Sequence, residues 1–478
     1  MKPGLAGIPA ILATAALAGC QPAEETTTTE TGSTVTTEAS VSGFQVPVEY
    51  HTLANGLKVV LSQDKTTPIV TVAVYYNIGF RIEPRERTGF AHLFEHMMFQ
   101  GSQNLGKGEF IGLVQANGGV LNGSTRFDFT NYFEIVPAHK LETMLWAEAD
   151  RMRSLDITQE NLTNQQGVVK NEVKVNVLNT PYGGFPWLDM PQYANENWYN
   201  AHNFYGDLED LDAANLEDVA DFFQQYYAPN NAALAIVGDF EYDEALAMVE
   251  KHFGDIVRSP QPIELPDITE PRQEAEKRAN RLDPLAPRPG FAFAYHVPAR
   301  LTPEWYAMGL LDQILLQGED SMLAQALVKE EGITAGISGG INALLGNMLN
   351  YKGPMLWLAS FVHDADVDDE RIIHAIDRVM ASVQDVPVDA DTLARAKIKW
   401  RSNFYNNASE TFGFGRADLL ASLALYDDNP ARINEFEAEI MKVTPEIIQA
   451  TAQEYLRSSN RTILVLEAGA GQEVANNE

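Results

Sequence analysis

The chain has 478 residues, of which 45% are hydrophobic and 21% are charged, so it can form two globular domains with substantial cores. Its formal net charge of -32 argues against nucleic-acid binding, which requires basic surfaces. The single cysteine excludes internal disulfides and any metal site built from cysteines.

The N-terminus has the features of a bacterial lipoprotein signal peptide. Lys2 precedes an apolar stretch at residues 5–17, which is too short to span a membrane. Residues 17–20 read Leu-Ala-Gly-Cys and resemble a lipobox, so we expect lipidation of Cys20 rather than a buried thiol. Gln21 is not the aspartate associated with inner-membrane retention. We therefore expect a periplasmic protein that is held to the membrane by a lipid alone, and we favour the outer membrane over the inner one.

The next segment favours a flexible tether followed by a folded domain. Residues 21–43 are rich in Thr, Ser and Glu and cannot bury a core. Residues 69–76 are almost continuously apolar and β-branched, which predicts a strand.

Two histidines four residues apart, His92 and His96, lie in the sequence His-Leu-Phe-Glu-His. On a helix this spacing places both rings on one face, where they can chelate one metal ion. Glu95 lies at the edge of that face, where its carboxylate can accept a proton from water without binding the metal. This order is the reverse of H-E-x-x-H and is called the inverzincin motif. The alternative is a buried helix with two hydrogen-bonded histidines.

The residues on both sides of the His-Leu-Phe-Glu-His motif also resemble those of a known family. Residues 79–102 read GFRIEPRERTGFAHLFEHMMFQGS and strongly resemble the M16 (pitrilysin-type) zinc peptidases, within them the short M16B-type chains related to the mitochondrial processing peptidase. The resemblance implies one Zn²⁺ per chain and a third, glutamate ligand about 76 residues after His96, at Glu172. Two histidines and a carboxylate are enough for catalytic zinc, which keeps one position open.

The resemblance also implies a fold. It is an α+β fold of the LuxS/MPP-like metallohydrolase type, with two homologous domains that each have a mostly antiparallel sheet packed with helices.

A second part of the match covers residues 115–137, where a glycine pair precedes alternating small, polar and aromatic residues that favour a strand. In the family this strand lies at the sheet edge beside the zinc and pairs with extended substrate. The resemblance therefore implies substrate contacts for Asn122, Gly123 and Thr125. An ordinary core strand is the alternative.

Glu172 falls within residues 158–178, which lack proline and favour a helix. Many relatives carry a second glutamate seven residues before the third ligand, but this chain has Gln165 there. Seven residues are two helical turns, so Gln165 shares the face of Glu172, yet its amide adds no negative charge. We expect metal binding to survive this replacement, with a changed zinc affinity or rate.

Six prolines and clustered charges favour an interdomain linker at residues 262–289. The family resemblance includes residues 230–240, which lie before this linker. After the linker, a similar order of strands and helices is suggested by residues 290–297, 306–316 and 371–383. We therefore expect two diverged copies of one domain. The predicted division is a signal peptide at 1–20, a tether at 21–43, a zinc-binding peptidase domain at 44–261, the linker at 262–289, an M16-like C-terminal domain at 290–470 and a tail at 471–478.

The C-terminal domain departs from the family pattern. M16 enzymes complete the site with an arginine and, seven residues later, a tyrosine from the half without zinc, in a segment like L-R-E-K-R-G-L-x-Y. The matching residues 327–335 read LVKEEGITA here, which places Val328 and Ala335 at those positions. Neither side chain can donate a hydrogen bond to a scissile carbonyl or its oxyanion.

Loss of one oxyanion donor typically costs ~10²- to 10³-fold in rate, so we expect this chain to be the zinc-bearing half of a heterodimer. A related chain would supply the arginine and the tyrosine, and the two chains would enclose a chamber for unfolded or short peptides. The resulting prediction is a zinc-dependent metalloendopeptidase. The alternatives are a non-catalytic assembly protein of the same fold and a lipoprotein that binds peptides without cleaving them.

Overall fold

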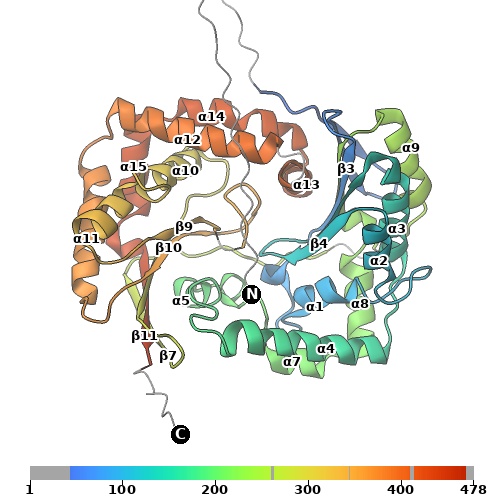
Figure 1. The fold of residues 1–478 in the computed structure, drawn as a ribbon, viewed down its shortest axis with the longest axis horizontal. Coiled ribbons are helices and arrows are strands. Elements are labelled where there is room, and N and C mark those ends of the chain that lie inside the picture. Colours follow the sequence, from blue (N-terminus) through green and yellow to red (C-terminus); the bar gives the residue numbers. More distant parts are fainter. Residues whose placement is uncertain (1–43, 260–262, 344, 410–413, 470–478) are drawn as a thin grey trace, which may run out of the picture. The chain divides into compact units, whose positions relative to one another are not determined.

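Two mixed sheets organise the computed structural model, which describes residues 44–259, 263–343, 345–409 and 414–469 (Figure 1). These residues belong to a compact unit that begins at Phe44. No helix within them is long and apolar enough to cross a membrane. Cys20, with the predicted signal peptide and tether, lies outside the described residues.

The first sheet has the strand order β1-β2-β6-β3-β5-β4. β2 and β6 run parallel, and the other neighbouring strands are antiparallel. The central strand β3 has the bounds that the sequence predicts, and its apolar run is buried on both faces. The strands are β1 (Glu49–Thr52), β2 (Lys58–Gln63), β3 (Ile69–Tyr76), β4 (Val120–Thr125), β5 (Thr130–Pro137) and β6 (Ala232–Gly238).

The second sheet repeats this arrangement with the order β7-β11-β8-β10-β9. β7 and β11 are parallel, and the other pairs are antiparallel. Strands β7, β11, β8, β10 and β9 therefore correspond in order and direction to β2, β6, β3, β5 and β4. The strands are β7 (Lys277–Asp283), β8 (Gly290–His296), β9 (Ser338–Ile341), β10 (Leu356–Val362) and β11 (Arg461–Ala468). This confirms the predicted fold class.

Helices from each half surround the sheets (Figure 1). The first half contributes α1 (Phe90–Met97), α2 (Glu109–Ala116), α3 (Leu141–Arg153), α4 (Gln159–Val173), α5 (Met190–Ala194), α6 (Trp198–Ala201), α7 (Leu208–Ala213), α8 (Leu216–Tyr226) and α9 (Tyr242–Phe253). Of these, α5 packs against β7, β8 and β11 of the second sheet. The second half contributes α10 (Pro303–Leu315), α11 (Asp369–Asp385), α12 (Ala390–Ser409), α13 (Gly415–Asp427), α14 (Phe436–Lys442) and α15 (Pro445–Tyr455).

The two halves share a hydrophobic core across the first sheet. On one face of β3, Val72 and Val74 pack with residues of α1 and α3. On the other face, Ala73 and Tyr75 belong to the core of the second half, whose helix α13 lies against this sheet (Figure 1). The hydroxyl of Tyr75 donates a hydrogen bond to Asp418 Oδ1 on α13 at 2.7 Å. The second half therefore supports one face of the first sheet, and α1 and α3 cover the other face.

The boundaries of the predicted linker at 262–289 stay a prediction, but the structure adds a strand inside it. Strand β7 reads KRANRLD and alternates between half-buried and exposed positions. It lies at the edge of its sheet and pairs only with β11 among the described residues. Charged residues are typical of edge strands because they discourage pairing with other chains. They also make such a strand difficult to recognise from the sequence.

Candidate metal centre

The N-terminus of α1 is fixed by a glycine and a buried carboxylate. Gly89 has φ of +80°, and a Cβ atom there would lie 2.5 Å from the carbonyl oxygen of Tyr205, so this approach requires glycine. The carboxylate of Glu83 accepts hydrogen bonds from the N–H groups of Gly89 and Ala91, at 2.9 and 2.6 Å. It thereby satisfies donors that a helix leaves free at its first turn. These contacts hold the helix that carries both histidines of the motif.

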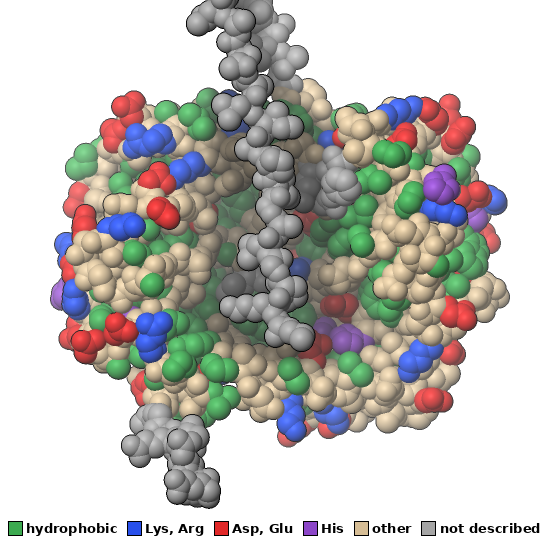
Figure 2. Space-filling model, viewed as in Figure 1, with side chains coloured by type: hydrophobic (Ala, Val, Ile, Leu, Met, Phe, Trp, Pro, Cys, Tyr) green, Lys and Arg blue, Asp and Glu red, His purple; other side chains and the backbone are tan. Residues whose placement is uncertain are grey.

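The three predicted ligands lie together. His92 Nε2 and His96 Nε2 are 3.2 Å apart, and Glu172 Oε2 lies 3.5 Å from the first and 3.3 Å from the second. Glu172 reaches the histidines because α4 packs against α1. Figure 2 shows histidine and acidic side chains together in the hollowed part of this face.

This triangle has the dimensions that zinc requires. Tetrahedral zinc with bonds of about 2.0–2.1 Å holds its ligand atoms roughly 3.3–3.4 Å apart. Burial, followed by the charge of His96, lowers the pKa of His92 to about 3, so its ring is neutral, as a ligand must be. Although burial raises the pKa of Glu172, the hydrogen bond with His96 helps to bring it below its usual value. The donor set therefore fits zinc.

Glu95 faces the edge strand β4. Its Oε2 accepts a hydrogen bond from Thr125 Oγ1 at 2.8 Å, and a Cβ atom at Gly123 would lie 3.4 Å from Glu95 Cγ. Burial raises the pKa of Glu95, against the hydrogen bond from Thr125 and the charges of His96 and Arg126. A half-buried carboxylate of raised pKa next to the ligand group is suited to proton transfer.

β4 is the edge strand of the first sheet and pairs only with β5 among the described residues. The structure brings Gly123 and Thr125 to Glu95, on the face toward α1. Asn122 is exposed, and its Oδ1 accepts a hydrogen bond from the N–H of Gly123 at 3.0 Å. β4 thus has the position of the predicted substrate strand, with its open edge beside the ligand group.

Gln165 is buried on α4, the helix that also carries Glu172. Burial lowers the pKa of His96, but the hydrogen bond with Glu172, the charge of Glu95 and a hydrogen bond with Gln165 together raise it. The amide therefore takes part in orienting a predicted ligand.

Sequence reasoning missed two aromatic residues beside the ligands. The hydroxyl of Tyr205 donates a hydrogen bond to Glu172 Oε1 at 3.1 Å, and the ring centroid of Phe204 lies 4.5 Å from that of His92. Burial, followed by the charge of Glu172, raises the pKa of Tyr205 to about 12, so this donor keeps its proton. The sequence signal for both is the segment AHNFYGD at residues 201–207, whose spacing does not by itself indicate a ligand. His202 Nε2 lies 3.7 Å from Glu83 Oε2, under the start of α1.

The predicted positions of the absent arginine and tyrosine lie in the second half. Val328 is in the π-helical turn η5 (Ala324–Glu330), and Ala335 lies between that turn and β9. Their side chains have no polar atoms, so neither position can supply a hydrogen-bond donor to the metal centre.

Two family models match the chain. Residues 58–188 match Insulinase (Peptidase family M16), and residues 213–399 match the Peptidase M16 inactive domain. The chain belongs to the M16 peptidase family, which confirms the resemblance stated above.

Individual relatives agree with the family assignment. The chain is 26% identical over 421 residues to Zinc protease PqqE of Helicobacter pylori, which covers 87% of this chain and 92% of that protein. It is 26% identical over 203 residues to Mitochondrial-processing peptidase subunit beta of Bos taurus, covering 42% of this chain and 41% of that protein. The crystal structure of a protease from Helicobacter pylori superimposes with a TM-score of 0.81 and 25% identity, over 88% of this chain and all of that one.

Proposed function

We propose that this chain is a zinc-dependent endopeptidase that cleaves unfolded or short peptides. The observation that carries the proposal is the triangle of His92, His96 and Glu172, with sides of 3.2 to 3.5 Å, next to the half-buried carboxylate of Glu95. The zinc protease among the relatives supports a peptidase at the level of the family.

The reaction divides among the chain's own residues. His92, His96 and Glu172 would hold the zinc, which supplies a Lewis acid that polarises a carbonyl and lowers the pKa of water. Glu95 takes the proton of the attacking water and returns it to the leaving amine. Thr125 orients the carboxylate of Glu95 by its hydrogen bond.

Substrate would bind along the open edge of β4. An extended peptide can add to such an edge through main-chain hydrogen bonds, which accept many sequences. Gly123 leaves room beside Glu95, because a side chain there would contact Glu95 and Tyr132. Asn122 would give up its hydrogen bond to the N–H of Gly123 when a peptide occupies the edge.

Substitutions at the centre test the roles separately. Glu95→Gln should retain zinc and abolish hydrolysis, whereas His92→Ala, His96→Ala and Glu172→Gln should lose zinc. Metal content by mass spectrometry and hydrolysis of a mixed peptide library give the two readouts, with His139→Ala as the control for loss of a histidine elsewhere. Undiminished zinc in any of the three ligand variants would remove that residue from the ligand set.

We further propose that a related M16 chain completes the enzyme. Val328 and Ala335 offer no donor for an oxyanion, and one relative is named as a subunit of the mitochondrial processing peptidase. Zinc-loaded residues 21–478 without another chain should therefore cleave the library feebly or not at all. Robust, chelator-sensitive cleavage by this chain alone would show that it needs no partner.

We also propose that Cys20 carries the lipid that holds the protein to a bacterial membrane, the outer one, on the periplasmic side. The support is the sequence Leu-Ala-Gly-Cys at residues 17–20 and the tether-like composition of residues 21–43. Cys20→Ser should prevent incorporation of labelled fatty acid and release the protein from the membrane fraction. Retention of both lipid and membrane association would disprove the assignment.

A further inference from the structure

Arg126 directly follows the open edge strand β4, and its guanidinium has no partner. The residue is half-buried, and among the described residues none forms a hydrogen bond or an ion pair with its side chain. The residue before it, Thr125, donates the hydrogen bond that orients Glu95. An unpaired cation therefore lies at the end of the edge strand that passes the metal centre.

The charge of Arg126 acts on groups of both faces of the first sheet. Burial raises the pKa of Glu95, and the charge of Arg126 is among the effects that oppose this rise. Burial also raises the pKa values of Tyr75 and Asp418, and the charge of Arg126 opposes these rises as well. Glu95 is on α1, whereas Tyr75 and Asp418 meet on the face that α13 covers. The guanidinium is therefore close to the metal centre and to the second half.

The carboxylates near Arg126 are engaged by other donors. Asp418 Oδ1 accepts a hydrogen bond from the hydroxyl of Tyr75 at 2.7 Å, and its Oδ2 accepts one from Asn350 Nδ2 at 3.1 Å. Glu95 keeps the hydrogen bond described above. The N–H groups of Arg126 thus stay available to a molecule that comes from outside this chain.

The main chain at Arg126 is fixed on both sides. Its N–H donates a hydrogen bond to the carbonyl oxygen of Phe129 at 2.8 Å, and its own carbonyl oxygen accepts one from the N–H of Phe80 at 3.1 Å. A Cβ atom at Gly79 would lie 2.4 Å from this oxygen, so the close approach requires glycine. Because both main-chain groups are used within the fold, Arg126 can bind a ligand only through its side chain.

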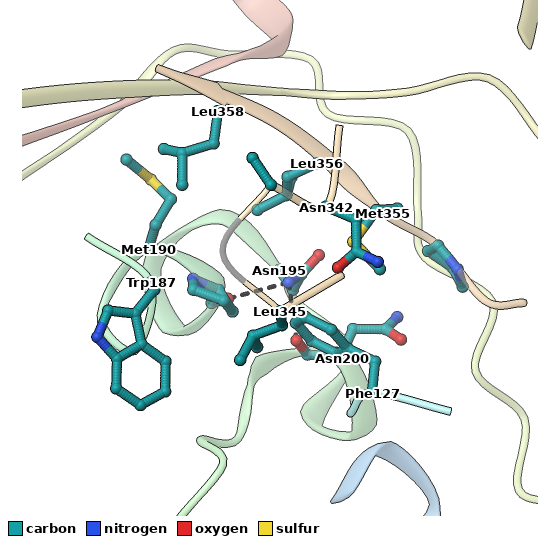
Figure 3. Close-up of a pocket in the computed structure, with 13 residues that line it drawn as sticks. Phe127, Trp187, Met190, Asn195, Asn200, Asn342, Leu345, Met355, Leu356 and Leu358 are labelled. Atoms are coloured by element: carbon teal, nitrogen blue, oxygen red, sulfur yellow. Dashed lines mark hydrogen bonds between the residues drawn. The ribbon is translucent and has the colours of Figure 1, made fainter. Parts of the chain in front are cut away.

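The next two residues of the turn are anchored to the second half. Figure 3 shows Phe127 close to Asn200, where both line a small cavity between the halves. Asp128 Oδ2 accepts hydrogen bonds from the N–H groups of Lys352 and Gly353, at 2.8 and 3.3 Å. The turn therefore has a defined position relative to both halves.

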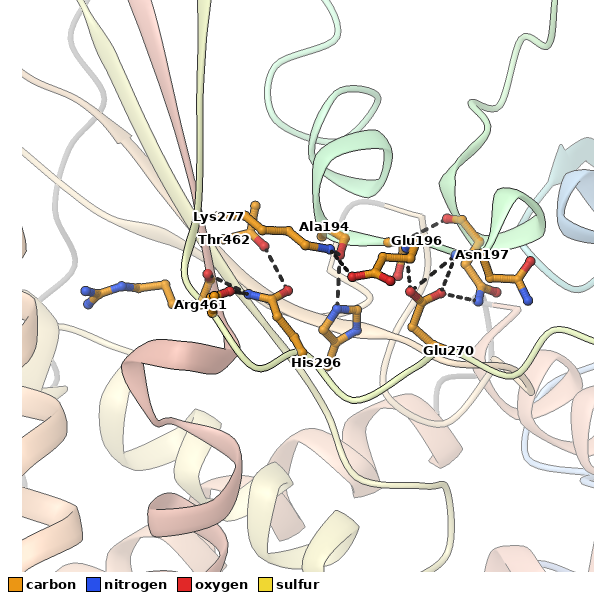
Figure 4. Close-up of polar contacts among 12 residues, drawn as sticks. Ala194, Glu196, Asn197, Glu270, Lys277, His296, Arg461 and Thr462 are labelled. Atoms are coloured by element: carbon orange, nitrogen blue, oxygen red, sulfur yellow. Dashed lines mark hydrogen bonds and ion pairs between the residues drawn. The ribbon is translucent and has the colours of Figure 1, made fainter.

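Asn200, which lies beside this turn, is itself held by the linker. Its Nδ2 donates a hydrogen bond to Glu270 Oε2 at 2.7 Å, and the same oxygen accepts the N–H of Asn197 at 3.3 Å (Figure 4). In the same segment, the carbonyl oxygen of Ala194 accepts a hydrogen bond from Lys277 Nζ at 2.8 Å. A side chain on such a fixed support binds a ligand with little cost for ordering the protein.

We infer that Arg126 binds a carboxylate of the peptide substrate, either an Asp or Glu side chain near the scissile bond or the C-terminal carboxylate. The inference rests on the proposed peptidase function, which it deepens by naming the substrate class. An extended peptide on the edge of β4 would pass this side chain, because Arg126 directly follows the strand. A guanidinium can form two parallel hydrogen bonds to a carboxylate, and such charge-assisted bonds are about twice as strong as neutral ones. The formal net charge of -32 disfavours acidic peptides, so the preference must arise at this position.

The test uses two sets of peptides. In the first set the C-terminus is amidated, and each position near the scissile bond carries Asp, Asn or Lys in turn. The second set has no acidic side chain, and its C-terminus is either free or amidated. The zinc-loaded full chain, with its partner chain if it needs one, should have a kcat/KM about 10- to 100-fold higher for the peptide with the carboxylate in one of the sets. The set that shows this ratio identifies the source of the carboxylate.

Variants of Arg126 link the ratio to this side chain. Arg126→Gln should bring the ratio to about one, whereas Arg126→Lys keeps the charge without the fork of donors and should retain part of it. Arg258→Gln, at an exposed arginine after α9, removes a positive charge elsewhere and should leave the ratio unchanged. Zinc content equal to that of the wild type shows that each variant keeps an intact metal centre.

Binding separates this inference from the proposed function. The full chain with Glu95→Gln is loaded with zinc, and fluorescence anisotropy compares labelled peptides with and without the carboxylate. Tighter binding of the carboxylate peptide, lost in Arg126→Gln, supports the inference even if no variant ever cleaves. Equal cleavage of Asp and Asn peptides and of free and amidated peptides overturns it while the peptidase proposal stands. A fall in kcat that is the same for every peptide in Arg126→Gln also overturns it, because that result would assign Arg126 to the reaction step.

Discussion

The hydroxyl of Tyr205 donates a hydrogen bond to Glu172 Oε1 at 3.1 Å, while Glu172 Oε2 faces the two histidines. The two oxygens of one carboxylate are therefore divided between an orienting donor and the metal position. Partners of this kind fix a ligand's geometry and tune its affinity for the metal. Tyr205 is held there because its backbone lies against Gly89 at the start of α1.

Tyr205→Phe should keep zinc in the site but weaken its binding about 10- to 100-fold, since the ring remains and only the orienting hydrogen bond is lost. Competition with a chromophoric chelator measures the affinity. Tyr242→Phe removes a hydroxyl that accepts a hydrogen bond from the N–H of Gln63, away from the ligands, and serves as the matched control. Equal zinc affinities for the two variants would assign Tyr205 to packing alone.

Glu83 should prove necessary for the stability of α1. Its buried carboxylate accepts hydrogen bonds from two N–H groups of the first turn, and Glu83→Ala leaves both without a partner. We expect a loss of about 1–3 kcal/mol in the free energy of unfolding, together with weaker zinc binding. Glu83→Gln keeps an acceptor oxygen and should lose less. Denaturant unfolding of the apo-protein, with the exposed Glu86→Ala as control, checks the order of the variants.

Helix α1, with its pair of candidate ligands, could be predicted from the sequence because the evidence for it is local. Two histidines at positions i and i+4 lie on the same face once a helix forms. In the same way, the apolar run of β3 indicates a buried strand. Glu172 came only from the family resemblance, because no local rule links a glutamate to a helix so far away. Tyr205 depends on a close approach of two glycines, Gly89 and Gly206, that only the fold brings about.

Of the strands in the second sheet, only β8 falls in a predicted segment, and two of the others, β7 and β9, are hard to recognise in the sequence for different reasons. β7 is polar because it lies at an edge, and β9 reads SGGI, in which Gly339 and Gly340 weaken the strand signal. A Cβ atom at Gly339 would lie 1.9 Å from the carbonyl oxygen of Leu358, so close approach to β10 requires a glycine there. In both strands the residues suit the position of the strand in the sheet, although they have a low propensity to form strands.

Asp312 should make stability depend on pH in the mildly acidic range. Burial raises the pKa of this carboxyl to about 6, against hydrogen bonds from Trp357 Nε1 and Gln317 Nε2. Because the folded-state pKa exceeds the ordinary value of 3.8, the folded state binds more protons between about pH 4 and pH 6. The stabilisation of the folded state by Asp312 is thus greatest below pH 4, and it is lost as the pH rises through 6.

Asp312→Asn removes this titration but keeps an acceptor for Trp357. The variant should gain stability over the wild type as the pH rises from 4 to 7, by a difference on the order of 3 kcal/mol. Denaturant unfolding at both pH values measures the difference between the two proteins, in which the other carboxylates cancel. A difference that does not change with pH would show that Asp312 titrates alike in the folded and unfolded states.

Because it has Gln165, this chain should bind zinc more weakly than a variant with a glutamate at this position. Gln165→Glu places a negative charge beside His96 and should tighten zinc binding about tenfold, as expected for groups that contact a ligand. Gln165→Met keeps the length of the side chain but loses its hydrogen bond, so it should bind zinc more weakly than the wild type. Gln159→Glu, exposed in the first turn of α4, controls for the added charge. If both glutamate variants tighten binding equally, the gain comes from net charge, and the position of Gln165 on the ligand face contributes nothing.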